Sequence, residues 1–372
     1  MRATVATESL LENLQTVARV ASTRSAVQAL SGVQLVADGE RIELRATDME
    51  VSLRLWLSAA IEEPGSVLLP ARLLLDIVRA LPGGSVTLEE RTERQDVQLV
   101  CANAVFDLRT LRSEDFPRLP ETPVGGVTLD ATAFVDTIAR VARSASRDDT
   151  RPVLTGILVH AAGNELRMAA TDSYRLSVKT TTLAAPVGEE FEANVPARAL
   201  QELSRIAAQI DAEEVAIAKL ENQVVFTVRG TAGATVLSSR LIDGQFPNYQ
   251  QLLPESVEHE LRVAREELAG VVRRISLLAQ KNAPLRLAFA EGELRVSAQT
   301  PDIGEAHETL PIGFNGEPFE IGFNPEFLRD GLESVESSEI MLRLTSPLRP
   351  GLIESADEGG FVYLVMPLRL GT

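Results

Sequence analysis

The residues that most often perform chemistry in proteins are few and scattered in this chain. His160, His259 and His307 stand alone, and none lies in the HExxH spacing or another spacing that a zinc site requires. The single cysteine, Cys101, excludes an internal disulfide and lies in the apolar run VQLVCANAVFDL, which favours a buried thiol over a nucleophile. The sequence contains no GxxxxGK(S/T) or GxGxxG phosphate loop and no GxSxG nucleophile turn. We therefore expect no metal, no cofactor and no catalytic centre.

Acidic residues occur in two arrangements that could carry a function. Asp148-Asp149, in SASRDDTRPVL, could bind a cation, but it lies between an expected helix and an expected strand, and we favour a turn. Asp48 and Asp172 stand in matching motifs, ELRATDMEVSL and AATDSYRLSV. We predict that each carboxylate accepts a backbone N–H in a shared turn. Two catalytic carboxylates would have to meet in space, which residues at repeated positions do not normally do.

Basic residues gather on the expected helices, although the chain carries a formal charge of -17. That charge argues against a protein that coats its whole exterior on nucleic acid. Arg140, Arg143 and Arg147 recur at i, i+3 and i+7, which predicts one basic stripe on a helix. The expected helices together hold more basic than acidic side chains. Two interpretations stay open, a solvated mixed-charge surface and a phosphate-facing surface on an acidic body.

The elements that must position these residues come from an internal repeat. Glu-Leu-Arg occurs at Glu43, Glu165 and Glu293, each time after a glycine turn in a β-rich run. The segments LLPARLLLDIVRAL, NVPARALQELSRIA and GFNPEFLRDGLESV each predict a helix that begins near a proline. A further amphipathic run opens each repeat. The expected helical stretches are residues 9–23, 71–82, 131–147, 197–209, 265–281 and 325–337.

Each repeat therefore has two helices and about eight strands. This pattern predicts an α+β fold with the helices packed on one face of mostly antiparallel sheets. Proline-rich segments 119–126 and 251–260 are typical linkers. The predicted domains are residues 1–121, 126–252 and 256–372. Charged residues near the N-terminus and the lack of a long apolar run argue against a signal peptide or membrane span, so we expect a cytoplasmic protein.

With this threefold repeat, the segments RPVLTGI, AATDSYRLSV, LIDGQFPNYQQLLP, IGFNP and VYLVMPLRL make the chain similar to the bacterial sliding clamps. These are the β subunits of the replicative DNA polymerase III holoenzyme, and the resemblance covers essentially the whole chain. It implies three clamp-type domains that form half of a six-domain dimeric ring, with helices lining the hole and sheets outside. It further implies a non-catalytic processivity factor, without cofactors, that encircles double-stranded DNA of any sequence as a head-to-tail homodimer. The ring would tether the replicative polymerase and other clamp-binding proteins after a separate ATP-dependent clamp loader has opened and loaded it.

The resemblance also implies three sets of site residues. The expected DNA contacts in the hole are Arg24, Arg72, Arg140, Arg143, Arg147 and Arg198. A groove between domains 2 and 3 would accept short peptides with a glutamine and a Leu-Phe-like end, and its expected walls are Leu154, Thr171, Ser173, Tyr174, Arg175, Leu176, Pro247, Leu252, Phe327, Leu364, Met366, Pro367, Leu368 and Arg369. The expected dimer interface sets Phe106 and Leu108 against Leu277 and Leu278, with Asp302, Glu305 and Glu308 near arginines such as Arg109.

The chain departs from the family pattern in its expected groove. Ser173-Tyr174 stands where Gly-His is familiar, and Leu368 stands where Met is familiar. One alternative is therefore a specialised or duplicate clamp whose altered groove tolerates an inhibitor. An alternative of another class is a hydrolase built from repeated α+β units, which would need converging acid, base or metal residues that the sequence does not show.

Overall fold

The structure, a computed structural model, describes residues 1–22, 25–123, 125–231, 233–254, 256–279, 283–357 and 359–370. These residues form two compact units. Unit 1 comprises Met1–Thr132, Val187–Glu189 and Arg198–Leu241, and unit 2 comprises Ala133–Pro186, Glu190–Ala197 and Ile242–Thr372. The second sequence repeat is divided between the two units, so the three predicted domain ranges stay predictions.

The described residues include one pair of helices for each sequence repeat. These are α1 (Thr7–Val17), α2 (Ala71–Ala80), α3 (Ala131–Val141), α4 (Ala197–Gln209), α5 (Arg265–Ile275) and α6 (Pro325–Glu333). Each start lies within two residues of the predicted one. At α6 the side chain of Asn324 accepts the backbone N–H of Glu326 at 2.9 Å, so this helix begins with a side-chain cap. None of the described helices is long and apolar enough to cross a membrane.

Several helices are shorter than their apolar periodicity predicts. After Val141 the chain tightens into a 3-10 turn over Ala142–Ser144, and Arg147 follows in irregular backbone. The predicted stripe of Arg140, Arg143 and Arg147 on one helix is therefore wrong. The apolar spacing continued past the helix because the following turn also buries side chains, Ala142 and Ser144 among them.

Unit 1 contains two antiparallel sheets. A five-stranded sheet has the order β5-β1-β7-β8-β9, made of Ala60–Glu63, Arg2–Ala6, Ser85–Arg91, Asp96–Cys101 and Ala104–Arg109. An eight-stranded sheet has the order β10-β15-β16-β17-β4-β3-β2-β6, made of Val127–Asp130, Ala212–Lys219, Gln223–Gly230, Gly233–Arg240, Val51–Ser58, Arg41–Thr47, Gly32–Asp38 and Gly65–Pro70. In its middle, β17 of the second repeat pairs with β4 of the first, with Leu237 opposite Leu53.

Unit 2 repeats this arrangement. Its eight-stranded sheet has the order β14-β11-β12-β13-β25-β24-β23-β18, made of Phe191–Pro196, Gly156–Ala162, Glu165–Thr171, Arg175–Thr182, Phe361–Val365, Gly351–Ser355, Glu339–Leu344 and His259–Ala264. A four-stranded sheet has the order β21-β20-β19-β22, made of Gly304–Pro311, Glu293–Thr300, Leu285–Ala290 and Phe319–Phe323. Here β13 of the second repeat pairs with β25 of the third, with Ser177 opposite Tyr363.

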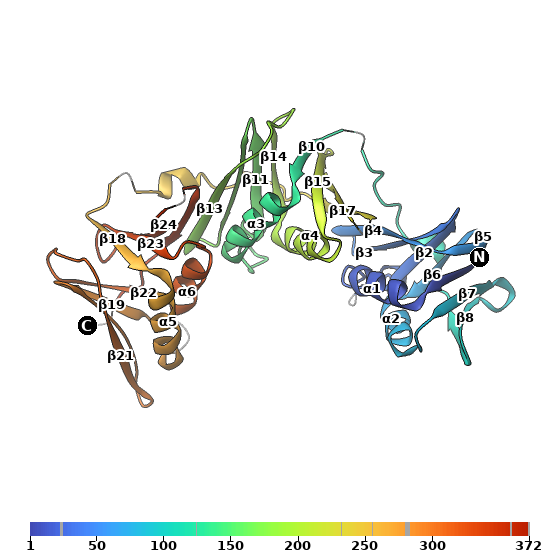
Figure 1. Ribbon diagram of the computed structural model, residues 1–372, viewed down its shortest axis with the longest axis horizontal. Coiled ribbons are helices and arrows are strands. Elements are labelled where there is room, and N and C mark those ends of the chain that lie inside the picture. Colours follow the sequence, from blue (N-terminus) through green and yellow to red (C-terminus); the bar gives the residue numbers. More distant parts are fainter. Residues whose placement is uncertain are drawn as a thin grey trace. The chain divides into compact units, whose positions relative to one another are not determined.

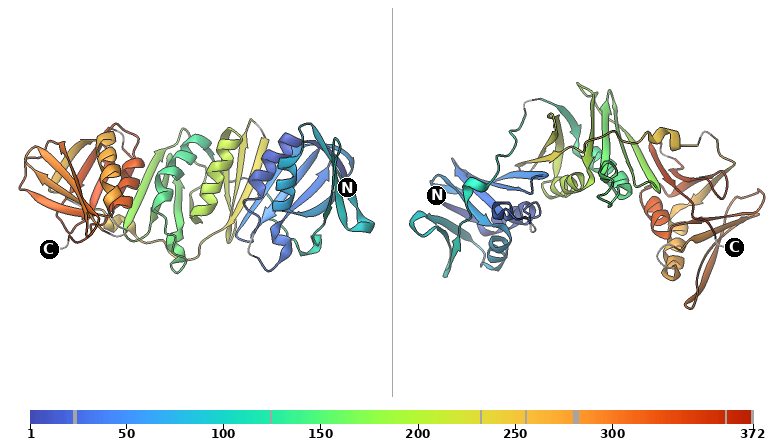
Figure 2. Two further views of the ribbon diagram at one scale, coloured as in Figure 1. Left: turned by 90° about the horizontal axis from the view of Figure 1, so that it is seen from below. Right: turned by 180° about the vertical axis from the view of Figure 1, so that it is seen from behind.

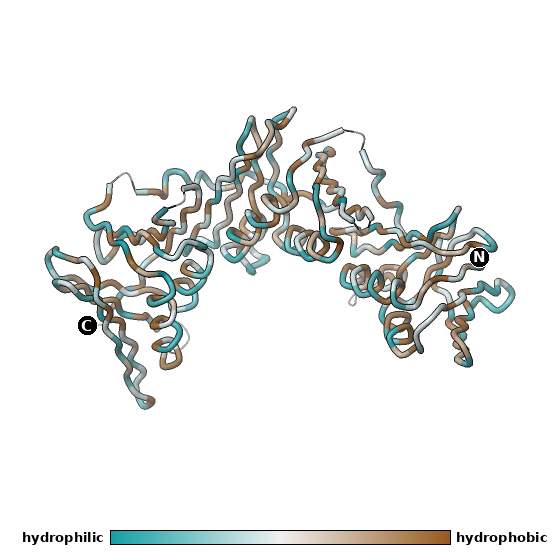
Figure 3. Tube along the Cα trace, viewed as in Figure 1, coloured by the Kyte–Doolittle hydropathy of each residue, from teal (hydrophilic) through white to brown (hydrophobic). Residues whose placement is uncertain are grey.

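Within each unit the helices lie on one face of the sheets, as the sequence predicts (Figures 1 and 2). Figure 3 shows apolar residues concentrated along strands and on helices, with polar residues at several hairpin turns. Leu10 and Leu14 of α1 and Phe134 of α3 are fully buried, which confirms the faces that their spacing predicted. The face of each eight-stranded sheet that lies away from the helices takes no part in this packing, so its residues can differ between the two units.

The two Thr-Asp motifs form the same turn, as predicted. In the first, Oδ1 of Asp48 accepts the backbone N–H of Val51 at 2.8 Å. In the second, Oδ1 of Asp172 accepts the backbone N–H of Tyr174 at 2.9 Å. The residue after each aspartate has a positive φ, 78° at Met49 and 80° at Ser173, so the matched turns share even this unusual backbone angle. Asp48 and Asp172 are therefore architectural and mark equivalent positions just before β4 and β13.

The face of the unit 1 sheet that lies opposite the helices carries a buried carboxylate between two arginines. Arg45 and Arg54 each donate a hydrogen bond of 2.6 Å to Glu43, one to each carboxylate oxygen. The Arg54 guanidinium also lies 5.4 Å from the centre of the Trp56 ring. Burial alone would raise the pKa of Glu43, but the hydrogen bonds and charges of Arg45 and Arg54 outweigh it and hold that pKa below its usual value.

We predict that Glu43→Gln destabilises the fold at neutral pH by about 1–3 kcal/mol, because two arginines lose their shared anion. A lowered pKa in the folded state adds stability above the ordinary glutamate pKa and loses it as the pH falls through the folded value. Thermal unfolding of both proteins from pH 7 to pH 3 should show a gap in Tm that narrows on acidification. A gap that stays constant over this range would contradict the ionic role of Glu43.

Candidate functional site

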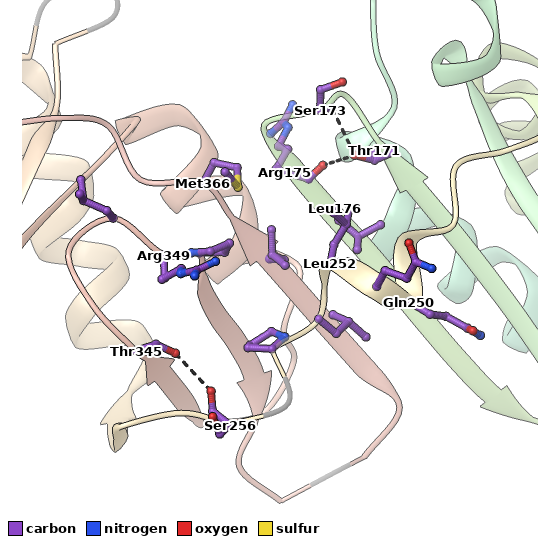
Figure 4. A pocket seen from close by; sticks show the side chains of 16 residues that line it. Thr171, Ser173, Arg175, Leu176, Gln250, Leu252, Ser256, Thr345, Arg349 and Met366 are labelled. Atoms are coloured by element: carbon purple, nitrogen blue, oxygen red, sulfur yellow. Dashed lines mark hydrogen bonds between the residues drawn. The ribbon is translucent and has the colours of Figure 1, made fainter.

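A partly apolar cavity lies in unit 2, where β13 meets β25. It encloses about 730 Å³ (Figure 4). Its lining residues come from β13 and the turn before it, from the chain that follows Tyr249, from the β23–β24 loop and from the end of β25. They are Thr171, Ser173, Arg175, Leu176, Gln250, Gln251, Leu252, Leu253, Pro254, Ser256, Thr345, Leu348, Arg349, Pro350, Leu364 and Met366.

The floor of the cavity follows from alternation in the two paired strands. Leu176 of β13 lies directly opposite Leu364 of β25, so the two side chains share one face of the sheet. Val178 and Val362 form the next pair on that face. The segment after Phe246 packs on part of this surface and completes a small apolar cluster there. An apolar trough remains beside that segment, and its chemistry suits aliphatic or aromatic anchor side chains.

The structure brings together half of the predicted groove residues. Seven of the predicted residues line the cavity, namely Thr171, Ser173, Arg175, Leu176, Leu252, Leu364 and Met366. Leu154 is buried, and Tyr174 stacks on Phe327 with 6.4 Å between the ring centres. Leu368 donates its backbone N–H to Gly322 at 2.8 Å. The predicted residues outside the lining are Leu154, Tyr174, Pro247, Phe327, Pro367, Leu368 and Arg369.

Sequence reasoning missed one whole wall of the cavity. This wall is the β23–β24 loop with Thr345, Leu348, Arg349 and Pro350, and Ser256 lies beside it. Figure 4 shows Thr171 and Ser173 at one end of the cavity and Ser256 with Thr345 at the other. No local signal marks the loop as part of a site, because it reaches the cavity only after β24 and β25 have paired. The remaining residues that were missed are Gln250, Gln251, Leu253 and Pro254.

Arg175 is held so firmly that it acts as a support of the cavity rim. Its guanidinium pairs with Asp172 at 3.0 Å and with Asp330 at 2.5 Å. It also lies 4.4 Å from the centre of the Phe327 ring, and Tyr174 stacks with the same ring. Burial alone would lower the pKa of the Arg175 guanidinium, but its acidic neighbours raise it, so the buried side chain stays charged. Two carboxylates already neutralise this cation.

Two of the predicted DNA contacts pair with acidic residues at or beside α6. Arg140 is buried, and it donates to the carbonyl of Ser334 at 2.8 Å while pairing with Asp136 and Glu336. This engagement makes Arg140 unsuited to the phosphate contact that the sequence suggested. Arg143 remains exposed, although it pairs with Glu333 at 2.5 Å.

Two further arginines meet in unit 1. Arg72 and Arg198 line one cavity of about 890 Å³ on the side of the helices, together with Arg19. Arg198 pairs with Asp48 at 2.8 Å, and Arg19 pairs with Glu202 at 2.7 Å. Arg147 is exposed, and Arg24 lies outside the described residues.

The predicted interface residues lie on two open sheet edges. Phe106 and Leu108 belong to β9, the last strand of the five-stranded sheet in unit 1. Leu277 and Leu278 form a 3-10 turn in contact with β20 and β21, and β21 is the edge of the four-stranded sheet in unit 2. Leu277 is 84% exposed.

Among the charged residues named with these edges, Glu308 already pairs with Arg274 through two hydrogen bonds, of 3.0 and 2.6 Å. The guanidinium of Arg109 donates to the carbonyl of Arg94. Glu308 is therefore already paired with a cation of its own chain, whereas the hydrogen bond of Arg109 to a neutral carbonyl leaves its positive charge unneutralised. Within the described part of the chain, no group of three or more His, Cys, Asp or Glu side chains could hold a metal ion.

Comparison with known proteins finds family models and relatives that agree with one another. The N-terminal, central and C-terminal domain models of the DNA polymerase III beta subunit match residues 1–120, 128–248 and 250–369. The chain is 33% identical over 380 residues to the Beta sliding clamp of Streptomyces coelicolor, with full coverage of both. It is 32% identical over 377 residues to the Beta sliding clamp homolog GriR of Streptomyces muensis, with 99% coverage of both.

Solved structures agree over the full length of both chains. The DNA polymerase sliding clamp from Bacillus subtilis has a TM-score of 0.92 at 28% identity. A sliding clamp (DNA polymerase III subunit beta) from Pseudomonas aeruginosa bound to griselimycin has a TM-score of 0.91 at 30% identity.

Arg175→Met should lower the free energy of unfolding by about 2–4 kcal/mol, because Asp172 and Asp330 lose a buried counter-ion and Phe327 loses its stacked cation. Urea denaturation measures this change. Arg147→Met is the matched control, since this exposed arginine should alter stability by less than about 0.5 kcal/mol. Equal costs for the two variants would show that Arg175 is not a structural support.

Proposed function

The chain belongs to the DNA polymerase III beta subunit family, the bacterial sliding clamps, and from this membership we propose how its surfaces work. Members of this family are non-catalytic processivity factors whose partners are DNA and the polymerase. The hydrolase alternative is therefore set aside. The proposals below concern the peptide groove, the DNA-facing arginines, closure of the ring and loading.

The cavity at the β13–β25 junction is proposed as the site that tethers the polymerase and other clamp-binding proteins. The observation that carries this proposal is the pair of leucines on its floor, Leu176 and Leu364, with Met366 and Leu252 beside them. Together they offer an apolar trough of adaptable shape, in which a short peptide can bury its anchor side chains. The walls add polar groups that can fix the direction of the peptide.

Duplex DNA is proposed to face the helices, as the family resemblance implies. Arg72 and Arg198 line one cavity on this side in unit 1, and Arg143 and Arg147 are exposed in unit 2. Arg143 and Arg198 also pair with carboxylates, so their phosphate contacts would be weak and readily exchanged. The formal charge of -17 over the whole chain opposes tight adhesion to DNA. Retention would then come from encirclement, without readout of base sequence.

Closure of the ring is supported by comparing equivalent strands of the three repeats. Leu111, Ile242 and Leu368 each donate a backbone N–H to the strand that precedes α2, α4 and α6, which aligns the three repeats. Counting five residues back from each reaches Phe106, Leu237 and Tyr363.

Leu237 and Tyr363 are 0% exposed and lie on strands that pair with the neighbouring repeat, whereas Phe106 is 36% exposed on β9, a sheet edge. By the same equivalence, β21 corresponds to β4 and β13, and among the described residues it has no strand on its outer side. We infer that β9 of one copy pairs with β21 of a second copy. Repeating this contact head to tail closes a homodimer of six repeats. Leu108, Leu277 and Leu278 would lie at that junction.

Loading is assigned to a separate ATP-dependent clamp loader, because this sequence has no phosphate-binding loop of its own. We also propose a cytoplasmic location, because the chromosomal DNA on which a bacterial clamp acts lies there. A specialised or inhibitor-tolerant clamp remains the alternative. The identities of 33% to the Streptomyces coelicolor clamp and 32% to the homolog GriR are nearly equal, so they favour neither role.

Topological retention predicts different fates on circular and linear DNA. After loading with the cognate loader and ATP on nicked circles, the protein should stay bound through a wash at ~0.5 M salt, which screens phosphate contacts. Linearising the circle with a restriction enzyme should release it, and blocking both ends should restore retention. Gel filtration of labelled protein with DNA measures this. Equal loss from circles and open linear DNA would contradict encirclement.

Closure of the ring through β9 and β21 predicts that Phe106→Asp weakens the dimer, since an unpaired carboxylate would be buried where these two strands meet. The variant should shift from twice the chain mass of 40.3 kDa toward that mass in light scattering, at concentrations where the parent is dimeric. Leu220→Asp, at an exposed leucine on the β15–β16 turn, is the control and should remain dimeric. A Phe106→Asp protein as dimeric as the parent would refute this interface.

A further inference from the structure

The charged residues that line the groove cavity are of one sign. Arg175 and Arg349 are its only charged lining residues among those that the structure describes, and no carboxylate faces the cavity. This contrasts with the whole chain, which carries a formal charge of -17. An anionic group that enters the cavity therefore meets positive charge, although the chain as a whole is negatively charged and repels anions.

The two arginines differ in how far their charge is already satisfied. Arg175 pairs with Asp172 and Asp330 inside the fold, at 3.0 and 2.5 Å. Its side chain is only 8% exposed, so a ligand could reach it only by breaking these contacts. Arg175 therefore supports the cavity and does not supply a free cation.

The charge of Arg349, in contrast, is not satisfied by other residues of the described chain. Arg349 is exposed on the β23–β24 loop, and its guanidinium makes no ion pair or hydrogen bond with any other residue in the described ranges. Its backbone is nevertheless held, because its N–H donates to the carbonyl of Ser346 at 3.1 Å and Pro350 restricts the backbone of the residue before it, Arg349 itself. The loop thus presents an available guanidinium from a fixed point on the wall.

Apolar neighbours make this position suited to recognition of a carboxylate. Leu348 precedes Arg349 on the same wall, and Leu364 with Met366 lines the cavity nearby. A bound peptide would cover these side chains and remove water around the guanidinium, which strengthens a charged hydrogen bond. The planar guanidinium can donate two parallel N–H groups to a single carboxylate.

We propose that Arg349 is a specificity-determining residue that binds an Asp or Glu side chain of the partner segment, beside its apolar anchors. This inference rests on the proposed function of the cavity as a peptide groove. Apolar anchors set the affinity, and the carboxylate selects among peptides whose anchors are alike. The acidic side chain is the committed ligand, and a free C-terminal carboxylate is a competing source that the test separates.

The test uses amidated heptapeptides of the sequence Ser-Gln-Leu-Ser-Leu-Phe-Ser, with Asp or Asn replacing each serine in turn. Fluorescence anisotropy measures Kd for the parent protein, Arg349→Gln and Arg349→Glu at low and high salt. At one or more positions the parent should prefer Asp over Asn by about three- to tenfold, and the preference should shrink with salt. Arg349→Gln should abolish the preference, and Arg349→Glu should reverse it toward a Lys peptide at the same position.

Control variants separate this inference from the proposed groove. Arg286→Gln removes a partly exposed arginine on β19, outside the groove cavity, and should keep the Asp preference. Met366→Ala should weaken every peptide alike, because it removes part of the apolar trough.

The contrary outcomes are distinct. Tight binding without any preference that depends on Arg349 would overturn this inference alone. The inference would also be overturned if Arg349 increased the affinity only for the unsubstituted peptide with a free C-terminal carboxylate, and not for the peptides that carry Asp. Failure of the parent to bind any of the peptides, or a Met366→Ala protein that binds as tightly as the parent, would overturn the proposed groove and this inference with it.

Discussion

The structure depends above all on strand pairing between different sequence repeats. β17 joins β4, and β13 joins β25, so each eight-stranded sheet crosses a repeat boundary through continuous backbone hydrogen bonds. An antiparallel strand at a sheet edge exposes a row of unpaired N–H and C=O groups, which favours addition of another strand. Among the edge strands of the described sheets, β9 and β21 are the two that correspond to strands paired across the repeat boundaries. The same pairing that builds each unit thus accounts for the proposed association of two copies.

The pairing also creates two comparable surfaces with different chemistry. Ser52 and Leu176 are equivalent, because each lies five residues after the threonine that begins its Thr-Asp turn. Ser52 lies opposite Ser238 in unit 1, whereas Leu176 lies opposite Leu364 in unit 2. Beside the serines stands Arg54, bound to Glu43, and beside the leucines stands Val178. One surface is therefore filled by its own ionic cluster, while the other keeps an apolar trough. This difference explains physically why one of two equivalent junctions is suited to a peptide with apolar anchors.

Local features were predictable from the sequence, and distant contacts were not. Helix starts and the turns at Asp48 and Asp172 depend on residues within a few positions, so motifs identify them. The end of α3 was overestimated, because apolar spacing continues through the buried 3-10 turn. The state of Arg143 depends on Glu333, which lies 190 positions away along the chain. Seven of the sixteen lining residues were predicted through family resemblance, but the wall that contains Arg349 becomes part of the site only when β24 lies beside β25.

The threefold repeat, the α+β class, the apolar faces of the helices and the family could all be inferred from the sequence, because each depends on the local order and spacing of residues. Which charges are available to a ligand depends on the folded chain. Arg140, Arg143 and Arg147 look alike as letters, yet one is buried in ion pairs, one is exposed and paired, and one is exposed. Arg175 and Arg349 line the same cavity, yet one is neutralised by two carboxylates and the other is open to a ligand. The physical reason is that the effect of a charge depends on its solvation and its partners, and folding supplies those partners from distant parts of the chain.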